Sequence, residues 1–269
     1  MILCAASSSL YIINDLRDIE KDKLHPFKKH RPLPSGNLSK NFALTTAAIL
    51  SLTALYGAST ISTSFLFLLL TFYGLQLSYT FFLKNVILLD ILAIAGTFIL
   101  RVFAGEIATG YHINIWLFLT VISLSLFLAI GKRRSELTLL SGWSGSIPVK
   151  TRETLSRYSE KMLDVYISMF ANSSWITYAL YTFLQRPPVI RQPLVKFLNQ
   201  YQLDILQERK LMTLTIPIAI YGIMRYLQLV YEKNEGESPE KVLFSDPPLM
   251  ITCLLMTIML FTIIYLIGT

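Results

Sequence analysis

The first 22 residues, MILCAASSSLYIINDLRDIEKD, run from an apolar stretch at 1–13 directly into a cluster of acidic side chains. Asp15, Asp18 and Asp22 are three and four positions apart, so on a helix their carboxylates share one face with Asn14. Like charges at this spacing repel one another unless a cation neutralises them. Hard carboxylate oxygens suit Mg²⁺, which keeps several waters and bridges to substrate phosphates. The cluster therefore predicts a magnesium and phosphate site.

The spacing alone leaves a solvated helix end, with interleaved basic residues, as an equal alternative. The next segment, HPFKKHRPLPSG at 25–36, favours the phosphate site because it is rich in cations and punctuated by proline. Lys28 and Arg31 are expected to face the carboxylates and to clamp a diphosphate whose Mg²⁺ is held by Asp15 and Asp18. A plain basic loop at a membrane surface is the alternative for this segment.

The composition predicts an integral membrane protein, since 53% of the 269 residues are hydrophobic and only 15% are charged. Most of the apolar runs approach the ~20 residues that span a bilayer, and backbone groups in lipid must be paired within helices. We therefore predict an all-α, polytopic transmembrane bundle of about eight helices, forming one domain over 1–269. The runs lie at 1–13, 42–59, 62–82, 86–108, 113–130, 163–183, 211–231 and 248–267.

The net charge of +7 comes from basic residues concentrated between the apolar runs. This placement favours lipid headgroups and phosphorylated substrates as partners and argues against nucleic acid. The connections on one side hold 17 Lys and Arg residues, and those on the other side hold five. By the positive-inside rule the first set is cytoplasmic. That set is 14–41, 83–85, 131–162 and 232–247. On the other side, 193–206 is amphipathic enough to form an interfacial helix.

Charged residues also fall inside the apolar runs, where they are costly and usually line a cavity or pair internally. Asp90 and Arg101 are eleven positions apart and share a helix face. We expect Asp90 to line the site, together with Tyr79 and Lys84, which lie near the same membrane surface as the aspartates. For Arg101, an ion pair with Glu106 or Asp90 is the structural alternative. A structural role is equally expected for Arg225.

Residues 11–22, followed by His25-Pro26 and Arg31-Pro32, resemble the first motif of the UbiA superfamily of intramembrane prenyltransferases. Segments 79–104 and 131–137, and Arg225-Tyr226 with 236–246, resemble the phosphoribosyl branch of that superfamily. The resemblance implies Mg²⁺-dependent transfer of 5-phosphoribose from phosphoribosyl diphosphate to a polyprenyl phosphate such as decaprenyl phosphate. Diphosphate is lost, and the product serves cell-envelope precursor synthesis.

The resemblance also implies roles for individual residues. Asp15, Asp18 and Asp22 are the expected catalytic residues, and Asp15 and Asp18 are the expected metal ligands. Aromatic prenyltransferases of the superfamily carry a second aspartate-rich motif after the sixth helix, where this chain has Lys132–Glu136. The nearest acidic pair is Glu160 with Asp164. The expected substrate-binding residues are Asn14, Lys28, Arg31, Tyr79, Lys84, Lys132, Arg133 and Glu136.

Two other functions compete with this prediction. One is a UbiA-type aromatic prenyltransferase that uses an isoprenyl diphosphate in quinone-type biosynthesis, for which a second acidic motif is expected. The other is a membrane protein without catalytic activity, such as a transporter or a truncated chain. Members of the superfamily begin with one further helix, and Met1 falls within what would be their second, so eight of nine helices are expected.

Overall fold

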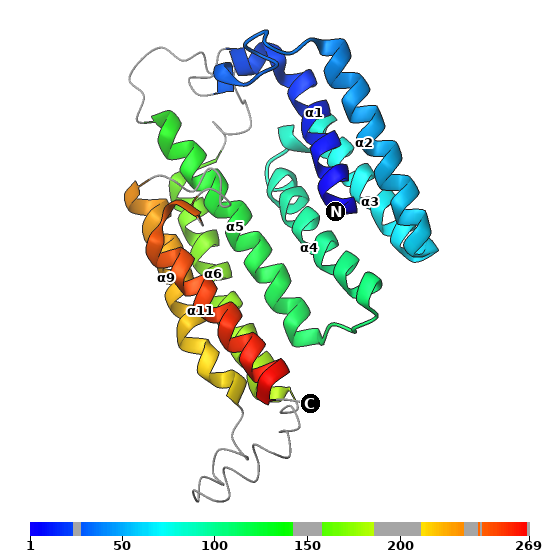
Figure 1. Cartoon of the computed structure of the whole chain (residues 1–269). Coiled ribbons are helices and arrows are strands. Elements are labelled where there is room, and N and C mark those ends of the chain that lie inside the picture. Colours follow the sequence, from blue (N-terminus) through cyan, green and yellow to red (C-terminus); the bar gives the residue numbers. More distant parts are fainter. Residues whose placement is uncertain (24–27, 142–157, 186–210, 234–241, 243, 268–269) are drawn as a thin grey trace, which may run out of the picture. The chain divides into compact units, whose positions relative to one another are not determined.

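The computed structural model describes residues 1–23, 28–141, 158–185, 211–233, 242 and 244–267. These residues form eight α-helices and, within the described ranges, no strand, so the predicted all-α fold is confirmed (Figure 1). The predicted interfacial helix at 193–206 lies outside the described residues. The helices are α1 (Ile2–Lys23), α2 (Lys40–Ile61), α3 (Thr63–Phe81), α4 (Leu89–Thr109), α5 (Ile115–Ser141), α6 (Glu160–Leu184), α9 (Ile216–Gln228) and α11 (Pro247–Phe261).

Several helices begin and end where the sequence supplies a cap. Ser39 caps α2, its hydroxyl accepting a hydrogen bond from the backbone N–H of the third helical residue. Ser62 ends α2 and caps α3, so one residue makes a tight reversal between two spans. Gly110 ends α4 at φ +73°, a left-handed conformation in which glycine has no Cβ to clash. These polar caps satisfy helix-end groups that lipid cannot.

The last two helices carry proline in their first turn. Pro217 lies in the first turn of α9, and Pro247 and Pro248 open α11, where a missing N–H costs no hydrogen bond. Asp246 caps α11 by accepting from the N–H of Leu249 at 3.1 Å. Irregular helical turns flank these two helices, a 3₁₀ turn at Leu211–Thr215 before α9 and wider π-type turns at Leu229–Lys233 and Thr262–Ile267 after α9 and α11.

The described residues fall into two compact units, one of 1–113 with 137–163 and one of 114–136 with 164–269. In the first unit, small side chains let α1 pack closely on α2, as in many membrane helix pairs. Ala6 of α1 and Ala54 and Ala58 of α2 are almost wholly buried. Leu69 and Phe72 of α3 complete this core.

In the second unit, α5 and α9 approach closely around an aromatic side chain. The rings of Phe127 and Tyr226 meet edge to face, with centroids 5.2 Å apart. A Cβ on Gly131 would lie 2.9 Å from the Tyr226 ring, so this position of α5 requires glycine. The Tyr178 hydroxyl of α6 lies 2.6 Å from the Thr215 hydroxyl in the turn before α9.

Six of the described helical segments are long and apolar enough to cross a membrane. They carry large apolar side chains on their surfaces, such as Leu52, Tyr56 and Phe67, as expected for contact with lipid. α1 and α6 fall short of this hydropathy. In α1 the apolar run gives way to the aspartates, and the middle of α6 carries Asn172, Ser173 and Ser174.

Two predicted connections begin too early in the chain. Residues 14–23 of the predicted connection 14–41 belong to α1. The sequence places residues 131–162 in a connection, but α5 continues through Ser141. Lys132, Arg133 and Glu136 therefore project from a helix rather than from a loop. The apolar run ends near residue 130, but the basic and acidic side chains that follow are good helix formers, so the helix continues.

Candidate active site

The acidic face of α1 is the centre of the candidate site. α1 continues as a helix through Lys23, so Asp15, Asp18 and Asp22 lie along one side of its last two turns. After the 3₁₀ turn at Lys28–His30 the chain returns to this face. Arg31 donates from Nη1 to Asp15 Oδ1 at 2.7 Å and lies 3.6 Å from Asp22 Oδ2. The expected approach of Arg31 to the aspartates is therefore observed.

A second cation reaches the same face from the connection between α3 and α4. Lys84, in the 3₁₀ turn Leu83–Asn85, donates from Nζ to both carboxylate oxygens of Asp18 at 2.7 Å. The Lys84 side chain is only 9% exposed and that of Asp18 only 16%. Water and salt screen a contact in such a protected position less than they screen a surface ion pair. The structure thus joins Asp18 and Lys84, 66 residues apart in the chain.

The donor set on α1 fits a substrate-borne Mg²⁺ better than a closed protein site. Within the described parts of the chain, no three His, Cys, Asp or Glu side chains gather closely enough to hold a metal ion. Mg²⁺ commonly uses one or two carboxylates, with waters and substrate phosphates completing its octahedron. Asp15 and Asp18 supply such a pair. Asn14 Oδ1 is buried and accepts no hydrogen bond from the described residues, so it offers a further oxygen.

Two other residues predicted for this site, Lys28 and Tyr79, lie on segments next to this face. Lys28 lies in the 3₁₀ turn after α1, and its side chain is outside the described part of the structure. Tyr79 is half-buried on α3, one turn before the segment that carries Lys84. On the opposite face of α1, the guanidinium of Arg17 lies 4.5 Å from the ring centroid of Phe81. That contact ties the end of α1 to the end of α3.

The predicted basic segment forms its own cluster in the second unit. Arg133 donates to Glu136 at 2.5 Å, and both side chains are almost fully buried. Lys132 is half-buried. The sequence did not single out Arg134, whose Nε donates to Asp164 at 2.7 Å while the Tyr231 hydroxyl donates to the same oxygen at 2.9 Å. Asp164, the second residue of the acidic pair noted in the sequence, thus contacts α5 and the turn after α9.

Arg101 has other partners than the ion pair that was considered as its structural alternative. Its guanidinium donates to the Ser7 hydroxyl at 3.2 Å and lies 5.6 Å from the ring centroids of Phe72 and Phe98. It pairs with neither Asp90 nor Glu106, because aromatic faces and a hydroxyl on neighbouring helices stabilise its charge instead. Glu106 accepts from the backbone N–H of Ile113 at 3.2 Å.

Arg225 has the structural role that was considered for it. Its Nε and Nη2 donate to the two oxygens of Asp246 at 2.9 and 2.6 Å. Asp246 is 2% exposed and also caps α11, so one carboxylate joins α9 to the start of the last helix. This bidentate contact uses the geometry that distinguishes arginine from lysine.

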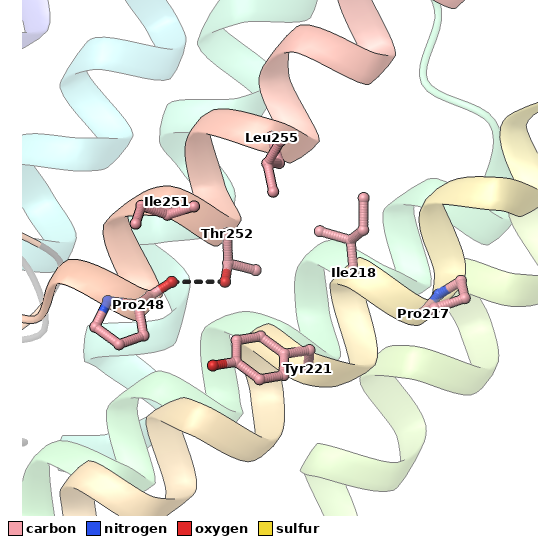
Figure 2. Close-up of a pocket in the computed structure, with 7 residues that line it drawn as sticks. All are labelled: Pro217, Ile218, Tyr221, Pro248, Ile251, Thr252 and Leu255. Atoms are coloured by element: carbon pink, nitrogen blue, oxygen red, sulfur yellow. Dashed lines mark hydrogen bonds between the residues drawn. The ribbon is translucent and has the colours of Figure 1, made fainter.

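An apolar groove lies between α9 and α11 (Figure 2). Its volume is about 520 Å³. Thr252 donates its hydroxyl to the carbonyl of Pro248 at 2.7 Å, so this polar group is satisfied within α11. None of the described residues that line the groove is charged, which makes it suitable for hydrocarbon and unsuitable for a diphosphate. Its lining residues are Pro217, Ile218, Tyr221, Pro248, Ile251, Thr252 and Leu255.

Apolar spans with carboxylates and cations gathered at a helix end define a helical membrane protein with a polar site on α1. The chain belongs to the UbiA prenyltransferase family, whose family model matches residues 1–135. It is an integral membrane protein, as its six apolar spans and its family indicate. The solved structure of a UbiA homolog from Archaeoglobus fulgidus bound to GPP and Mg²⁺ has the same fold. The TM-score is 0.67 at 16% identity, covering 97% of this chain and 87% of that one.

Curated relatives share more of the sequence. Decaprenyl-phosphate phosphoribosyltransferase from Corynebacterium glutamicum is 30% identical over 257 residues, which is 94% of this chain and 71% of that protein. The protein of the same name from Mycolicibacterium smegmatis is 31% identical over 183 residues, or 68% of this chain. That match spans 56% of the length of the M. smegmatis protein. The predicted resemblance to the phosphoribosyl branch is therefore confirmed.

Proposed function

We propose that this chain transfers 5-phosphoribose from phosphoribosyl diphosphate to a polyprenyl phosphate, releasing diphosphate in a Mg²⁺-dependent reaction. The observation that supports it best is the α1 face, where Asp15, Asp18 and Asp22 meet Arg31 and Lys84. Carboxylates beside cations suit a magnesium diphosphate, because the carboxylates match the metal ion and the cations match the phosphate oxygens. The names of the curated relatives support phosphoribose as the transferred group.

In the proposed reaction the bond from the anomeric carbon to the diphosphate oxygen breaks, and a bond to an oxygen of the lipid phosphate forms. Asp15 and Asp18 would hold Mg²⁺, which withdraws charge from the departing diphosphate when bound. The Lys84 ammonium has three N–H donors, so it would donate to a phosphate oxygen while it still contacts Asp18, and Arg31 would donate to another phosphate oxygen. The acceptor phosphate is already ionised at neutral pH, so the chain needs no strong general base. Asn14 would hold the donor through its buried amide.

The second unit is proposed to bind a phosphate through α5. Lys132 is the half-buried cation of the predicted set and is the best suited to contact a phosphate oxygen. Arg133 is held by Glu136 in a nearly solvent-free position, so we assign this pair to bracing the helix around Lys132. An apolar groove such as that between α9 and α11 suits the hydrocarbon of a lipid substrate.

The test uses membranes that contain the full chain, radiolabelled phosphoribosyl diphosphate and a polyprenyl phosphate. Butanol-extractable label is expected with Mg²⁺ and is expected to disappear when the metal is chelated. Membranes that lack the chain provide the background. An isoprenyl diphosphate with a phenolic acid acceptor tests the aromatic prenyltransferase. Label absent from the lipid fraction under all donor and acceptor conditions would instead favour a membrane protein without catalytic activity.

Replacing Lys84 by Met is expected to raise the KM for the donor by about 10-fold or more, because Asp18 loses both of its short contacts and the diphosphate loses a cation. Lys84→Arg keeps the charge but places a wider guanidinium in a position that is 9% exposed, so partial loss is expected. Steady-state kinetics with varied donor measure both. A KM for the donor within twofold of wild type in Lys84→Met would contradict the proposed contact with diphosphate.

The proposed site is expected to face the cytoplasm, because the basic connections share that side. A single cysteine at His30, which is exposed and follows α1, should be labelled by an impermeant maleimide only in inverted vesicles. A cysteine at Tyr111, 80% exposed in the connection after α4, should be labelled only from the other side. Cys4 and Cys253 are exposed and are first replaced by Ala. The reversed pattern would refute the predicted orientation.

A further inference from the structure

The turn that carries Lys84 to Asp18 ends in a strained backbone. Residues 83–85 form the 3₁₀ turn, and α4 begins at Leu89. Between them Leu88 adopts φ +67° and ψ −38°, and it is the one non-glycine residue with positive φ in the described part of the chain. A leucine in this conformation is unfavourable and persists only where its surroundings hold it.

The hydroxyl of Tyr158 holds this turn. It accepts a hydrogen bond from the backbone N–H of Leu88 at 2.7 Å. It also donates to Asp90 Oδ1 at 2.5 Å, and the same carboxylate oxygen accepts from the N–H of Ile91 at 2.8 Å. Tyr158 is 5% exposed and Asp90 is 2% exposed, so water competes little with these contacts. One hydroxyl thus bridges the strained residue and the buried acid two positions later.

The short turn between Lys84 and Leu88 links the Tyr158 bridge to the candidate site. Lys84 lies four residues before Leu88, and the backbone between them is a short turn fixed by hydrogen bonds from Asn85 and Val86 to Phe82 and Leu83. A shift at Leu88 would therefore move the Lys84 ammonium away from Asp18, a contact now at 2.7 Å. Displacements of about 1 Å in such a site are costly.

We propose that Tyr158 is a positioning residue, whose hydroxyl holds the 83–90 turn and thereby keeps Lys84 on Asp18. Its action on catalysis rests on the proposed function of that ion pair. Asp90, for which site lining was predicted, acts in this proposal as the acceptor that orients the tyrosine hydroxyl.

The test replaces Tyr158 by Phe, which keeps the ring and removes the bridging hydroxyl. The first measurement is independent of catalysis. It is the rate at which Lys84 is acetylated in the folded membrane protein in detergent, measured by mass spectrometry of the peptide that contains Lys84. Lys84 is 8% exposed, and its acetylation is expected to accelerate about 10-fold in Tyr158→Phe. The second measurement is the KM for phosphoribosyl diphosphate, which is expected to rise about 10-fold with the KM for the lipid acceptor unchanged.

Two further variants separate positioning from general destabilisation. Tyr56→Phe is the matched control, because Tyr56 is 75% exposed on α2, and it should leave both measurements unchanged. Adding Leu88→Gly to Tyr158→Phe should restore much of the Lys84 protection, because glycine adopts positive φ without strain and the turn then needs less support. If Tyr158→Phe acted only by destabilising the fold, removing the Leu88 side chain, which is 42% exposed, would not restore the protection of Lys84.

The outcomes distinguish the two proposals. Unchanged acetylation of Lys84 in Tyr158→Phe would overturn the positioning role, whatever the activity. Faster acetylation with an unchanged KM for the donor would overturn the link between the turn and catalysis. If wild type transfers no phosphoribose, the proposed function and that link fail together, whereas faster acetylation reversed by Leu88→Gly would still support the hold of Tyr158 on Lys84.

Discussion

Asp18→Asn is expected to reduce phosphoribosyl transfer by at least about 100-fold, with the helix and its packing intact. The amide keeps the size of the side chain but removes the negative charge that a magnesium diphosphate requires. It also removes the partner of Lys84, whose ammonium contacts both carboxylate oxygens at 2.7 Å. Initial rates with saturating donor and acceptor measure the loss, and added Mg²⁺ is expected to restore little of it.

The matched control for this variant is Glu20→Gln on the same helix end. Glu20 has a side chain that is 78% exposed and pairs only with Lys23 among the described contacts, at 2.9 Å. The hydrogen bond from Lys23 lowers the pKa of the Glu20 carboxyl, so it is ionised at neutral pH. Its removal should change the rate less than about twofold. Equal losses in the two variants would refute a specific role for Asp18.

Asp246→Ala is expected to lower the free energy of unfolding by about 3 kcal/mol, the largest stability effect that the contacts predict. The substitution removes the two acceptors of Arg225 and the cap of α11 at once. Asp246→Asn is the informative comparison, because asparagine is also a good cap and retains one oxygen for Arg225. Thermal unfolding in detergent should therefore rank wild type above Asp246→Asn and Asp246→Ala lowest. Equal stability of wild type and Asp246→Ala would contradict the structural assignment of Arg225.

The all-α fold was predictable because hydropathy alone sets where a chain can cross a membrane. The eight apolar runs correspond to the eight observed helices. Helix ends were less predictable, since α1 and α5 continue well beyond their apolar runs into charged sequence. Helical hydrogen bonding there depends on local propensity rather than on lipid, so the end of an apolar run does not mark the end of a helix.

The acidic half of the site was also predictable, since the spacing of Asp15, Asp18 and Asp22 requires only that the segment be a helix. For Asp18 and Lys84, the sequence predicts only that both lie near the same membrane surface. Their direct contact was not predictable, because contacts between distant segments depend on packing. Tyr158 was missed for the same reason. A buried acid such as Asp90 signals that some donor must meet it, but nothing in the sequence selects a tyrosine 68 positions later.

The choice of donor is the central claim, and a competition measures it most directly. Purified chain in lipid vesicles with Mg²⁺ is given equal amounts of phosphoribosyl diphosphate and an isoprenyl diphosphate, each with a distinct label, together with polyprenyl phosphate and a phenolic acid. We expect phosphoribosyl label on the polyprenyl phosphate, release of one diphosphate per transfer, and at most about a hundredth of either in Asp18→Asn. Isoprenyl label on the phenolic acid, with no phosphoribosyl label on the polyprenyl phosphate, would refute phosphoribosyl diphosphate as the donor.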